Sequence, residues 1–170
     1  AERLAAADPS KLSWQRDLSV SHDSIGDVLR VQGDLAGALQ AYRDSLGVRE
    51  RLAAADPSNT GWQRDLSLSF ERIGEVLQAQ GDLAGALQAY RDSLVIRERL
   101  AAADPSNAGW QRDLTVSYWK MAEIAERTGQ DDALSWWRKA HDQLAGMKRR
   151  GIMQPTDEPY LQDLQRKISG

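Results

Sequence analysis

A 48-residue unit recurs along this chain and constrains its fold more than any other feature. The stretch GDLAGALQAYRDSL occurs unchanged at residues 33–46 and 81–94, and the pentad WQRDL begins at Trp14, Trp62 and Trp110. Residues 13–60 and 61–108 are identical at 37 of 48 positions. A period of about 20 to 50 residues is typical of a solenoid, in which each unit buries its apolar face against its neighbours. We therefore expect function to lie in the surface that the stacked units create.

The balance of charge gives no reason to expect nucleic-acid binding. Lysine and arginine total 22 and aspartate and glutamate total 25, a net charge of -3, whereas general binding to nucleic acid needs clustered basic charge. The one tight basic run, Lys148, Arg149 and Arg150, falls at the expected end of a helix, where cations favourably meet the helix dipole.

The composition also gives no indication of a disulfide framework or a membrane span. Cysteine is absent, so neither disulfides nor a thiolate metal site is indicated. No apolar run approaches the roughly 20 residues that span a bilayer, and no signal-peptide pattern opens the chain. We expect a cytoplasmic location, with no membrane, cofactor or metal among the binding partners.

Each unit carries two apolar stripes at helical spacing. In the middle unit, Trp62, Leu66, Phe70, Ile73 and Leu77 fall at steps of three and four residues, which predicts one face of a helix. A second stripe follows the next glycine and stops at an Asp-Pro pair, because proline cannot continue helical hydrogen bonding. No period-two run indicates a strand. The sequence predicts an all-α fold with helix pairs at 13–32 and 34–55, 60–80 and 82–103, and 109–128 and 131–149.

The repeat boundaries divide the chain into five parts. Residues 13–60 and 61–108 are repeats 1 and 2, residues 109–150 are a divergent repeat 3, and residues 151–170 are a linker and a polar C-terminal capping helix near 157–168. Residues 1–12 match the end of a repeat, so we expect them to be the tail of a preceding one, with a short half-helix at residues 1–7 and further repeats upstream.

The spacing of the unit resembles the tetratricopeptide repeat. Phe70, Ile73-Gly74, Leu77, Gly81-Asp82, Ala86, Tyr90 and Ser93 stand at that family's signature positions, and the first copy repeats them. The unit is 14 residues longer than the usual 34, which is similar to the long repeats of kinesin light chains and of bacterial multidomain proteins. The resemblance implies an α-solenoid of antiparallel helix pairs in a right-handed superhelix. We expect the extra residues to lengthen both helices, with Trp14, Trp62 and Trp110 sealing the added layer.

No constellation of residues indicates an enzyme. The two histidines, His22 and His141, are each followed by aspartate but lack the further ligands or nucleophile that a metal or catalytic site needs. Phosphate-binding glycine loops, GxSxG and HExxH are absent. Because WQRDL recurs unchanged, we interpret it as part of the stacking geometry, with Asp65 or Asp113 pairing an arginine of a neighbouring helix such as Arg49 or Arg97.

The resemblance implies that the first helices line a concave surface that binds a peptide of a partner protein. The corresponding positions here have an acidic centre, so we expect the partner segment to carry lysine or arginine. The alternative for these acids is a merely solvated helix face, and the alternative function is a structural or end-to-end self-associating array. The predicted partner-binding residues are Asp23, Asp27, Arg30, Glu71, Arg72, Glu75, Gln78, Trp119, Lys120, Glu123 and Glu126.

Overall fold

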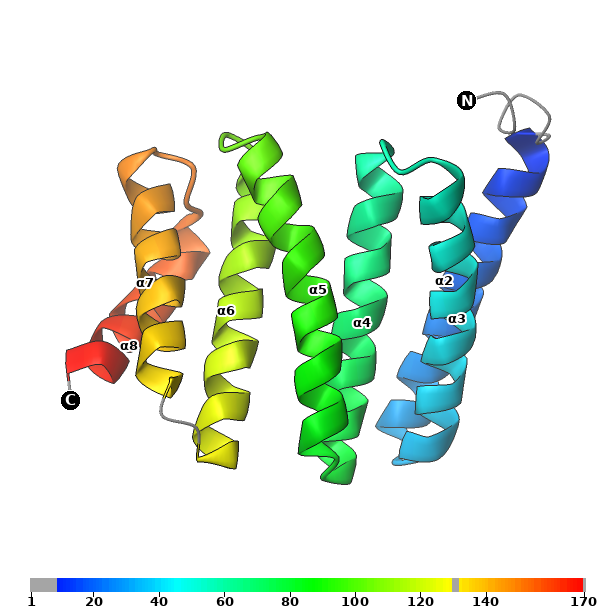
Figure 1. Cartoon of the computed structure of the whole chain (residues 1–170), viewed down its shortest axis with the longest axis horizontal. Helices are drawn as coiled ribbons and strands as arrows, with labels where there is room; N and C mark the ends of the chain where they lie inside the picture. Colours follow the sequence, from blue (N-terminus) through cyan, green and yellow to red (C-terminus); the bar gives the residue numbers. More distant parts are fainter. Residues whose placement is uncertain (1–8, 130–131, 170) are drawn as a thin grey trace. The chain divides into compact units, whose positions relative to one another are not determined.

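The computed structural model describes residues 9–129 and 132–169, and within them it is built from helices alone. The predicted half-helix at residues 1–7 lies outside the described part of the chain. The expected all-α class and the unbroken long helices are confirmed, with no strand in the described ranges. The helices in Figure 1 are α2 (Pro9–Val31), α3 (Leu35–Ala55), α4 (Thr60–Gln80), α5 (Leu83–Ala103), α6 (Ala108–Thr128), α7 (Ala133–Arg149), the short 3-10 helix η1 (Pro155–Asp157) and α8 (Glu158–Ser169).

The chain divides into two compact units, Ala1–Ser93 and Leu94–Gly170, which we describe separately. In the first unit, α2 packs against α3 and α3 packs against α4. In the second, α6 packs against α7, and α7 packs against α8. Tight turns at Gly33-Asp34 and Gly81-Asp82 join the helices of the first two pairs, so these pairs form antiparallel hairpins, as the repeat pattern predicts.

Side-chain caps set the start of α4 and α6. Asn59 and Asn107 each accept a hydrogen bond from the backbone N–H three residues on, at 3.1 Å in both cases. The first copy has Lys11 at the place of Asn59, and a lysine cannot accept this bond. There α2 begins at Pro9, four residues before the predicted start, because proline is well suited to the first turn of a helix.

A glycine in each of the first two hairpins lets a tyrosine ring lie directly on the helix backbone. A Cβ atom on Gly26 would lie 2.5 Å from the Tyr42 ring, and one on Gly74 would lie 2.5 Å from the Tyr90 ring. Both tyrosines are buried on the second helix of their hairpin. The Ile-Gly signature therefore reflects close approach between the two helices of a pair.

This contact predicts opposite effects for two glycine-to-alanine changes in the first unit. We expect Gly74→Ala to lower the free energy of unfolding by about 1 to 3 kcal/mol, because the Tyr90 ring must move. Gly47→Ala, in the middle of α3, should raise it by about 0.5 to 1 kcal/mol, because alanine favours a helix and the added methyl group meets nothing closer than 3.9 Å. Urea denaturation of both variants tests this; losses of equal size would show that the ring contact is not tight.

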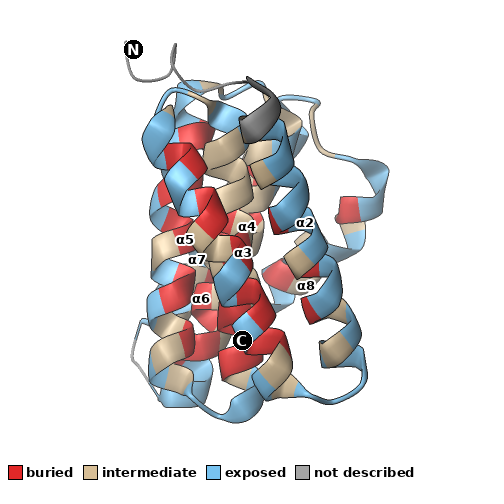
Figure 2. Cartoon of the chain, turned by 90° about the vertical axis from the view of Figure 1, so that its right-hand side faces the viewer, coloured by how far each residue is buried: buried red, intermediate tan, exposed pale blue. Residues whose placement is uncertain are grey.

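The tryptophans of the WQRDL pentads do not form the buried layer predicted for them. Trp14 is 70% exposed, and Trp62 and Trp110 are only half-buried. Buried residues instead recur along the helices, interleaved with exposed ones (Figure 2). Near the level of the pentads, the buried positions include an arginine, Arg49, together with the small side chains Ser19 and Ser69. The added length of the hairpin is therefore filled in part by polar contacts.

Candidate partner-binding surface

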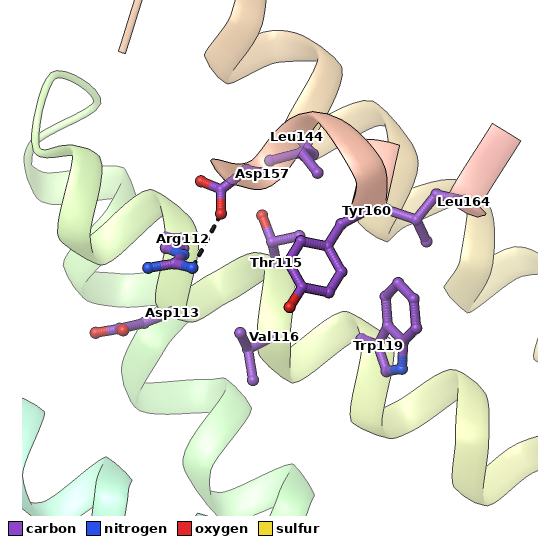
Figure 3. Close-up of a pocket in the computed structure, with 9 residues that line it drawn as sticks. All are labelled: Arg112, Asp113, Thr115, Val116, Trp119, Leu144, Asp157, Tyr160 and Leu164. Atoms are coloured by element: carbon purple, nitrogen blue, oxygen red, sulfur yellow. Dashed lines mark ion pairs between the residues drawn. The ribbon is translucent and has the colours of Figure 1, made fainter. Parts of the chain in front are cut away.

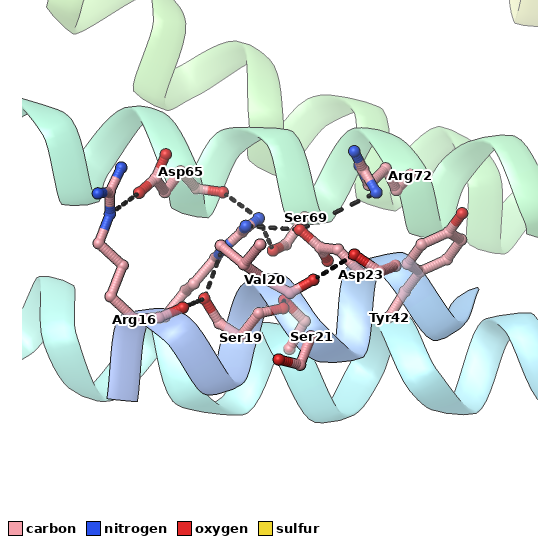
Figure 4. A network of polar contacts seen from close by, with 12 residues as sticks. Arg16, Ser19, Val20, Ser21, Asp23, Tyr42, Asp65, Ser69 and Arg72 are labelled. Atoms are coloured by element: carbon pink, nitrogen blue, oxygen red, sulfur yellow. Dashed lines mark hydrogen bonds and ion pairs between the residues drawn. The ribbon is translucent and has the colours of Figure 1, made fainter. Parts of the chain in front are cut away.

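A buried arginine from α3 joins the two first helices of the first unit. The Arg49 guanidinium contacts the Asp23 carboxylate of α2 at 2.5 Å and donates to the Ser69 hydroxyl of α4 at 2.9 Å. Arg49 and Asp23 are each 6% exposed, and Figure 4 shows Asp23 and Ser69 facing each other across the helices. A buried charge needs a partner charge and satisfied hydrogen bonds. Asp23, which the sequence places on the binding surface, therefore holds the stack together.

The recurrent pentad contributes to the same network, through different atoms from those predicted. Arg49 donates to the backbone carbonyl of Asp65 at 3.0 Å, while the Asp65 carboxylate lies 3.4 Å from Arg16 of α2. In the second unit, Arg97 likewise donates to the backbone carbonyl of Asp113 at 3.1 Å. The predicted residues do meet, but the bond from the second-helix arginine goes to the backbone of the aspartate.

A second cluster bridges α2 and α4 nearer the surface. Asp27 accepts a hydrogen bond from the Tyr42 hydroxyl at 2.6 Å, and both of its oxygens accept from Arg72 at 3.1 Å. Burial, followed by the hydrogen bond and the negative charge of Asp27, raises the pKa of Tyr42 to about 12. Burial lowers the pKa of Arg72, but the charges of Asp23 and Asp27 outweigh it, so its pKa is raised. Because Asp27 and Arg72 offset each other, the first unit is less acidic here than the sequence suggests.

The remaining predicted residues of the first unit lie further along these helices. Glu71 and Glu75 of α4 are half-buried, and Arg30 is exposed near the end of α2. Gln78 accepts a hydrogen bond from the Tyr90 hydroxyl at 2.7 Å. None of these four residues is fully buried.

In the second unit, two predicted acids hold tryptophan rings in place. The Trp119 indole donates to Glu123 at 2.9 Å, and the Trp137 indole donates to Glu126 at 2.7 Å. The two rings meet edge to face, with centroids 5.0 Å apart. Glu126 also lies 3.4 Å from Lys167 of α8. Lys120, between the acids on α6, is half-buried.

A hollow of about 370 Å³ opens between α6 and the C-terminal segment (Figure 3). At one end, Arg112 pairs with Asp157 at 2.9 Å, and Trp119 lines the hollow further along α6. The sequence pattern does not reveal this hollow, because the spacing of Asp157, Tyr160 and Leu164 predicts only a capping helix. The residues that line it are Arg112, Asp113, Thr115, Val116, Trp119, Leu144, Asp157, Tyr160 and Leu164.

The described residues offer no metal site and no membrane span. No group of three or more histidine, cysteine, aspartate or glutamate side chains in them could hold a metal ion. His141 contacts its neighbour Asp142 at 3.0 Å, and His22 is half-buried on α2. None of the described helices combines the length and the hydrophobicity needed to cross a bilayer.

Comparison with known proteins identifies the repeats. The family model described as Tetratricopeptide repeat matches residues 23–57 and 68–105, and these segments contain the glycine–tyrosine contacts described above. The two segments are tetratricopeptide repeats. The third hairpin lies beyond the matched segments, in agreement with its divergent sequence.

Solved structures and curated proteins add little to this family assignment. Two structures titled as crystal structures of MamA are 14% and 16% identical, cover 78% and 85% of this chain and 95% of their own, and have TM-scores of 0.30. Values this low carry no argument about function. No curated protein matches the chain. The described part of the chain is thus all-α, and it contains two tetratricopeptide repeats.

The hairpins bury or neutralise some of the predicted residues and leave the others partly exposed. Asp23 is buried, and Asp27 and Arg72 neutralise each other. The other predicted residues are half-buried or exposed: Arg30, Glu71, Glu75, Gln78, Trp119, Lys120, Glu123 and Glu126.

Proposed function

We propose that the first helices of the repeats bind a peptide segment of a partner protein. The observation that carries this proposal is the distribution of differences between repeats 1 and 2. Of the 11 positions that differ, eight precede the Gly-Asp turn, and most of these recur at steps of three and four residues, as on one face of a helix. The second helices differ at only two positions, Gly47/Val95 and Val48/Ile96. Positions that are free to vary are the ones that can encode a partner.

Burial supports the same division. The arginine and tyrosine that are identical in both second helices, represented by Arg49 and Tyr42, are buried. The variable positions Glu71, Glu75 and Gln78 of α4 are half-buried at the surface. A peptide laid over such a surface contacts side chains that are partly exposed and that differ between the repeats, which is the arrangement a recognition surface needs.

The surface acids indicate the charge of the partner segment. Glu71 and Glu75 lie one helical turn apart on α4, and Glu123 and Glu126 lie at a similar spacing on α6. Lysine or arginine in the partner would add to the contacts that these carboxylates already make within the chain. Because exposed charges are screened beyond about 8 Å at physiological salt, this attraction affects encounter rate and selectivity more than affinity. Apolar anchors such as Trp119 would have to hold the complex.

We expect the double variant Glu71→Gln and Glu75→Gln to slow association with a basic peptide and to flatten the salt dependence of its rate. Peptides are selected from a phage-displayed library of random heptapeptides against the unaltered protein, and rates are measured by surface plasmon resonance. The matched control, Asp44→Asn with Glu50→Gln, removes the same charge from exposed positions of α3. Unchanged kinetics in the double variant, or equal changes in the control, would contradict binding on α4.

A second candidate function, self-association, is favoured by the exposed apolar face of α2. Ile25 and Val28 are 51% and 55% exposed, whereas their equivalents in α4, Ile73 and Val76, are buried. The helix α8 covers α7, with Leu164 fully buried between them, so continuation of the stack beyond α7 is blocked there. Self-association would therefore pair α2 of one molecule with α2 of another.

Light scattering across protein concentration tests this alternative. A two-fold contact between α2 faces would give a mass that rises towards twice that of one chain, and Ile25→Asp should abolish the rise. Val95→Asp, at an exposed apolar position of α5, is the control and should leave it unchanged. A mass that stays at one chain at all concentrations would exclude the α2 face as a self-association surface.

A further inference from the structure

We propose that the hollow between α6 and α8 is a pocket for one bulky apolar side chain of a peptide, whose backbone amide is held by the Arg112–Asp157 pair. This inference rests on the proposed function and names the chemistry of one subsite on the second unit. The occupant is a leucine, methionine or phenylalanine in an extended segment. An unsatisfied carboxylate, a preorganised apolar wall and a difference between the two units support this assignment.

The carboxylate of Asp157 lacks one hydrogen bond. Asp157 is 2% exposed, and its Oδ1 lies 2.9 Å from an Arg112 nitrogen, but its Oδ2 is buried and has no hydrogen-bond partner. Leaving a buried acceptor unsatisfied is unfavourable, and native proteins rarely do so without a reason. An N–H group that came within hydrogen-bond distance of this oxygen would satisfy it.

The partner of Asp157 supplies the complementary group. The Arg112 side chain is about half exposed, and a guanidinium carries five N–H donors, of which the ion pair uses one. The pair thus offers an acceptor and further donors side by side at one end of the hollow (Figure 3). A peptide bond offers one donor and one acceptor in the same way. Because the pair is neutral as a whole, it favours an uncharged amide over a lone ion.

The rest of the hollow is apolar and already ordered. Val116 and Trp119 of α6 line the hollow together with Tyr160 and Leu164 of α8, and Leu144 of α7 also lines it. The Trp119 ring meets Tyr160 edge to face, with centroids 6.3 Å apart, and its indole N–H is bound by Glu123. The volume of about 370 Å³ is within the range of roughly 300 to 1,000 Å³ for ligand pockets. A side chain can therefore enter without a further cost in ordering the wall.

The first unit shows why the hollow belongs to the third repeat. Arg16 of α2 reaches Asp65 on the next first helix at 3.4 Å, as Arg112 of α6 reaches Asp157. Beside that contact the first repeat has Asp23, which is occupied by Arg49, whereas the third repeat has Trp119 at the equivalent position. The exchange of an ion-paired carboxylate for an aromatic ring makes this subsite apolar.

The test uses a probe with one apolar side chain between two amides, N-acetyl-leucine amide. We expect it to shift the Trp119 indole signal in a saturable way in nuclear magnetic resonance spectra of the protein, and N-acetyl-alanine amide to bind at least about tenfold more weakly, which corresponds to about 1.4 kcal/mol. Equal binding of the two probes, or no saturable shift with the leucine probe, would overturn the inference.

Substitutions at Val116 and Asp157 test whether the leucine probe binds in the hollow. Val116→Phe fills the hollow and should abolish the shift, whereas Val20→Phe, at the equivalent and half-exposed position of α2, should leave it intact. Asp157→Asn offers a second test that does not depend on filling: it preserves the shape of the side chain but alters the amide-binding end, so the leucine probe should bind at least about tenfold more weakly. Unchanged binding to both variants, with their helical content retained, would overturn the inference.

The library-selected peptides separate failure of this inference from failure of the proposed function. If they bind, weaken with Glu71→Gln and Glu75→Gln, and bind Val116→Phe unchanged, the proposed function stands and the pocket inference is overturned. If no selected peptide perturbs α2, α4 or α6 while the leucine probe still saturates the Trp119 signal, the pocket is supported and peptide binding by the first helices is what fails. Selected peptides that share a bulky apolar residue and lose affinity in Val116→Phe support both.

Discussion

Asp23→Asn is expected to lower the free energy of unfolding by about 3 to 5 kcal/mol, because it leaves the charge of Arg49 buried without its partner. The two side chains are each 6% exposed and lie 2.5 Å apart. Urea denaturation followed by circular dichroism measures the loss. Asp17→Asn, at an exposed position of the same helix, is the control and should change the value by about 0.5 kcal/mol or less.

A double variant tests whether the stability of the first unit depends on the charges of Asp23 and Arg49 or only on the volume that the two side chains fill. Replacing a buried ion pair by apolar residues of similar volume is often neutral or stabilising, whereas removing one partner is costly. We therefore expect Asp23→Leu combined with Arg49→Met to be more stable than Asp23→Asn alone. Equal denaturation midpoints for Asp23→Asn and Asp17→Asn would show that the Arg49 network does not hold the first unit together.

Trp137→Ala is expected to have an effect of similar size in the second unit, about 3 to 5 kcal/mol. Trp137 is 2% exposed and packs in the cluster that contains Leu144, Met147 and Leu164. Its loss would open a cavity under α8 and remove the hydrogen bond to Glu126, which is 2.7 Å long. The measurement is again the free energy of unfolding in urea.

The neighbouring residue provides a matched control for that prediction. Trp136 is only half-buried, and the Lys139 ammonium lies 4.0 Å from its ring centroid. Trp136→Ala removes the same side chain from a solvated position, so we expect a loss nearer 1 kcal/mol, the size of a cation–π contact with some burial. Losses of equal size at the two positions would contradict the assignment of Trp137 to the core.

The helices could be predicted from the sequence because local signals and the repeat agree. Asparagine N-caps and glycine C-caps recur at fixed spacing in α4 and α6. The ends of these two helices lie within a residue or two of the predicted bounds. The start of α2 was predicted four residues late, because Lys11 replaces the asparagine cap and nothing local then favours residue 13 over Pro9. The start of α2 thus differs from the repeat pattern where the local capping signal is missing.

The buried network was not predicted, because a large aromatic residue is a stronger sequence signal for a core than an arginine. The burial of Trp14 depends on what packs over it, and in the first unit nothing described does so. The sequence does contain a usable signal: an arginine that is identical in both second helices, together with small serines such as Ser19 and Ser69 on the first helices, which leave room for a guanidinium. That Asp23 is its counter-ion follows only from the packing of α2 on α3.

The hollow could not be predicted from the repeat pattern, for a related reason. It depends on α8, which lies outside the repeated unit, and on Trp119, which replaces an acid of the other copies. Sequence reasoning assigned Trp119 to the surface as an apolar anchor, and the structure places it in the hollow. The facing residues Tyr160 and Leu164 could be identified only from the packing of α8.

The claim that the first helices form the recognition surface is tested most directly by amide chemical-shift mapping of the whole chain with a library-selected peptide. We expect perturbations at the variable positions of α2, α4 and α6, with Trp119 among the most strongly shifted residues. Perturbations confined to the second helices α3, α5 and α7 would contradict it.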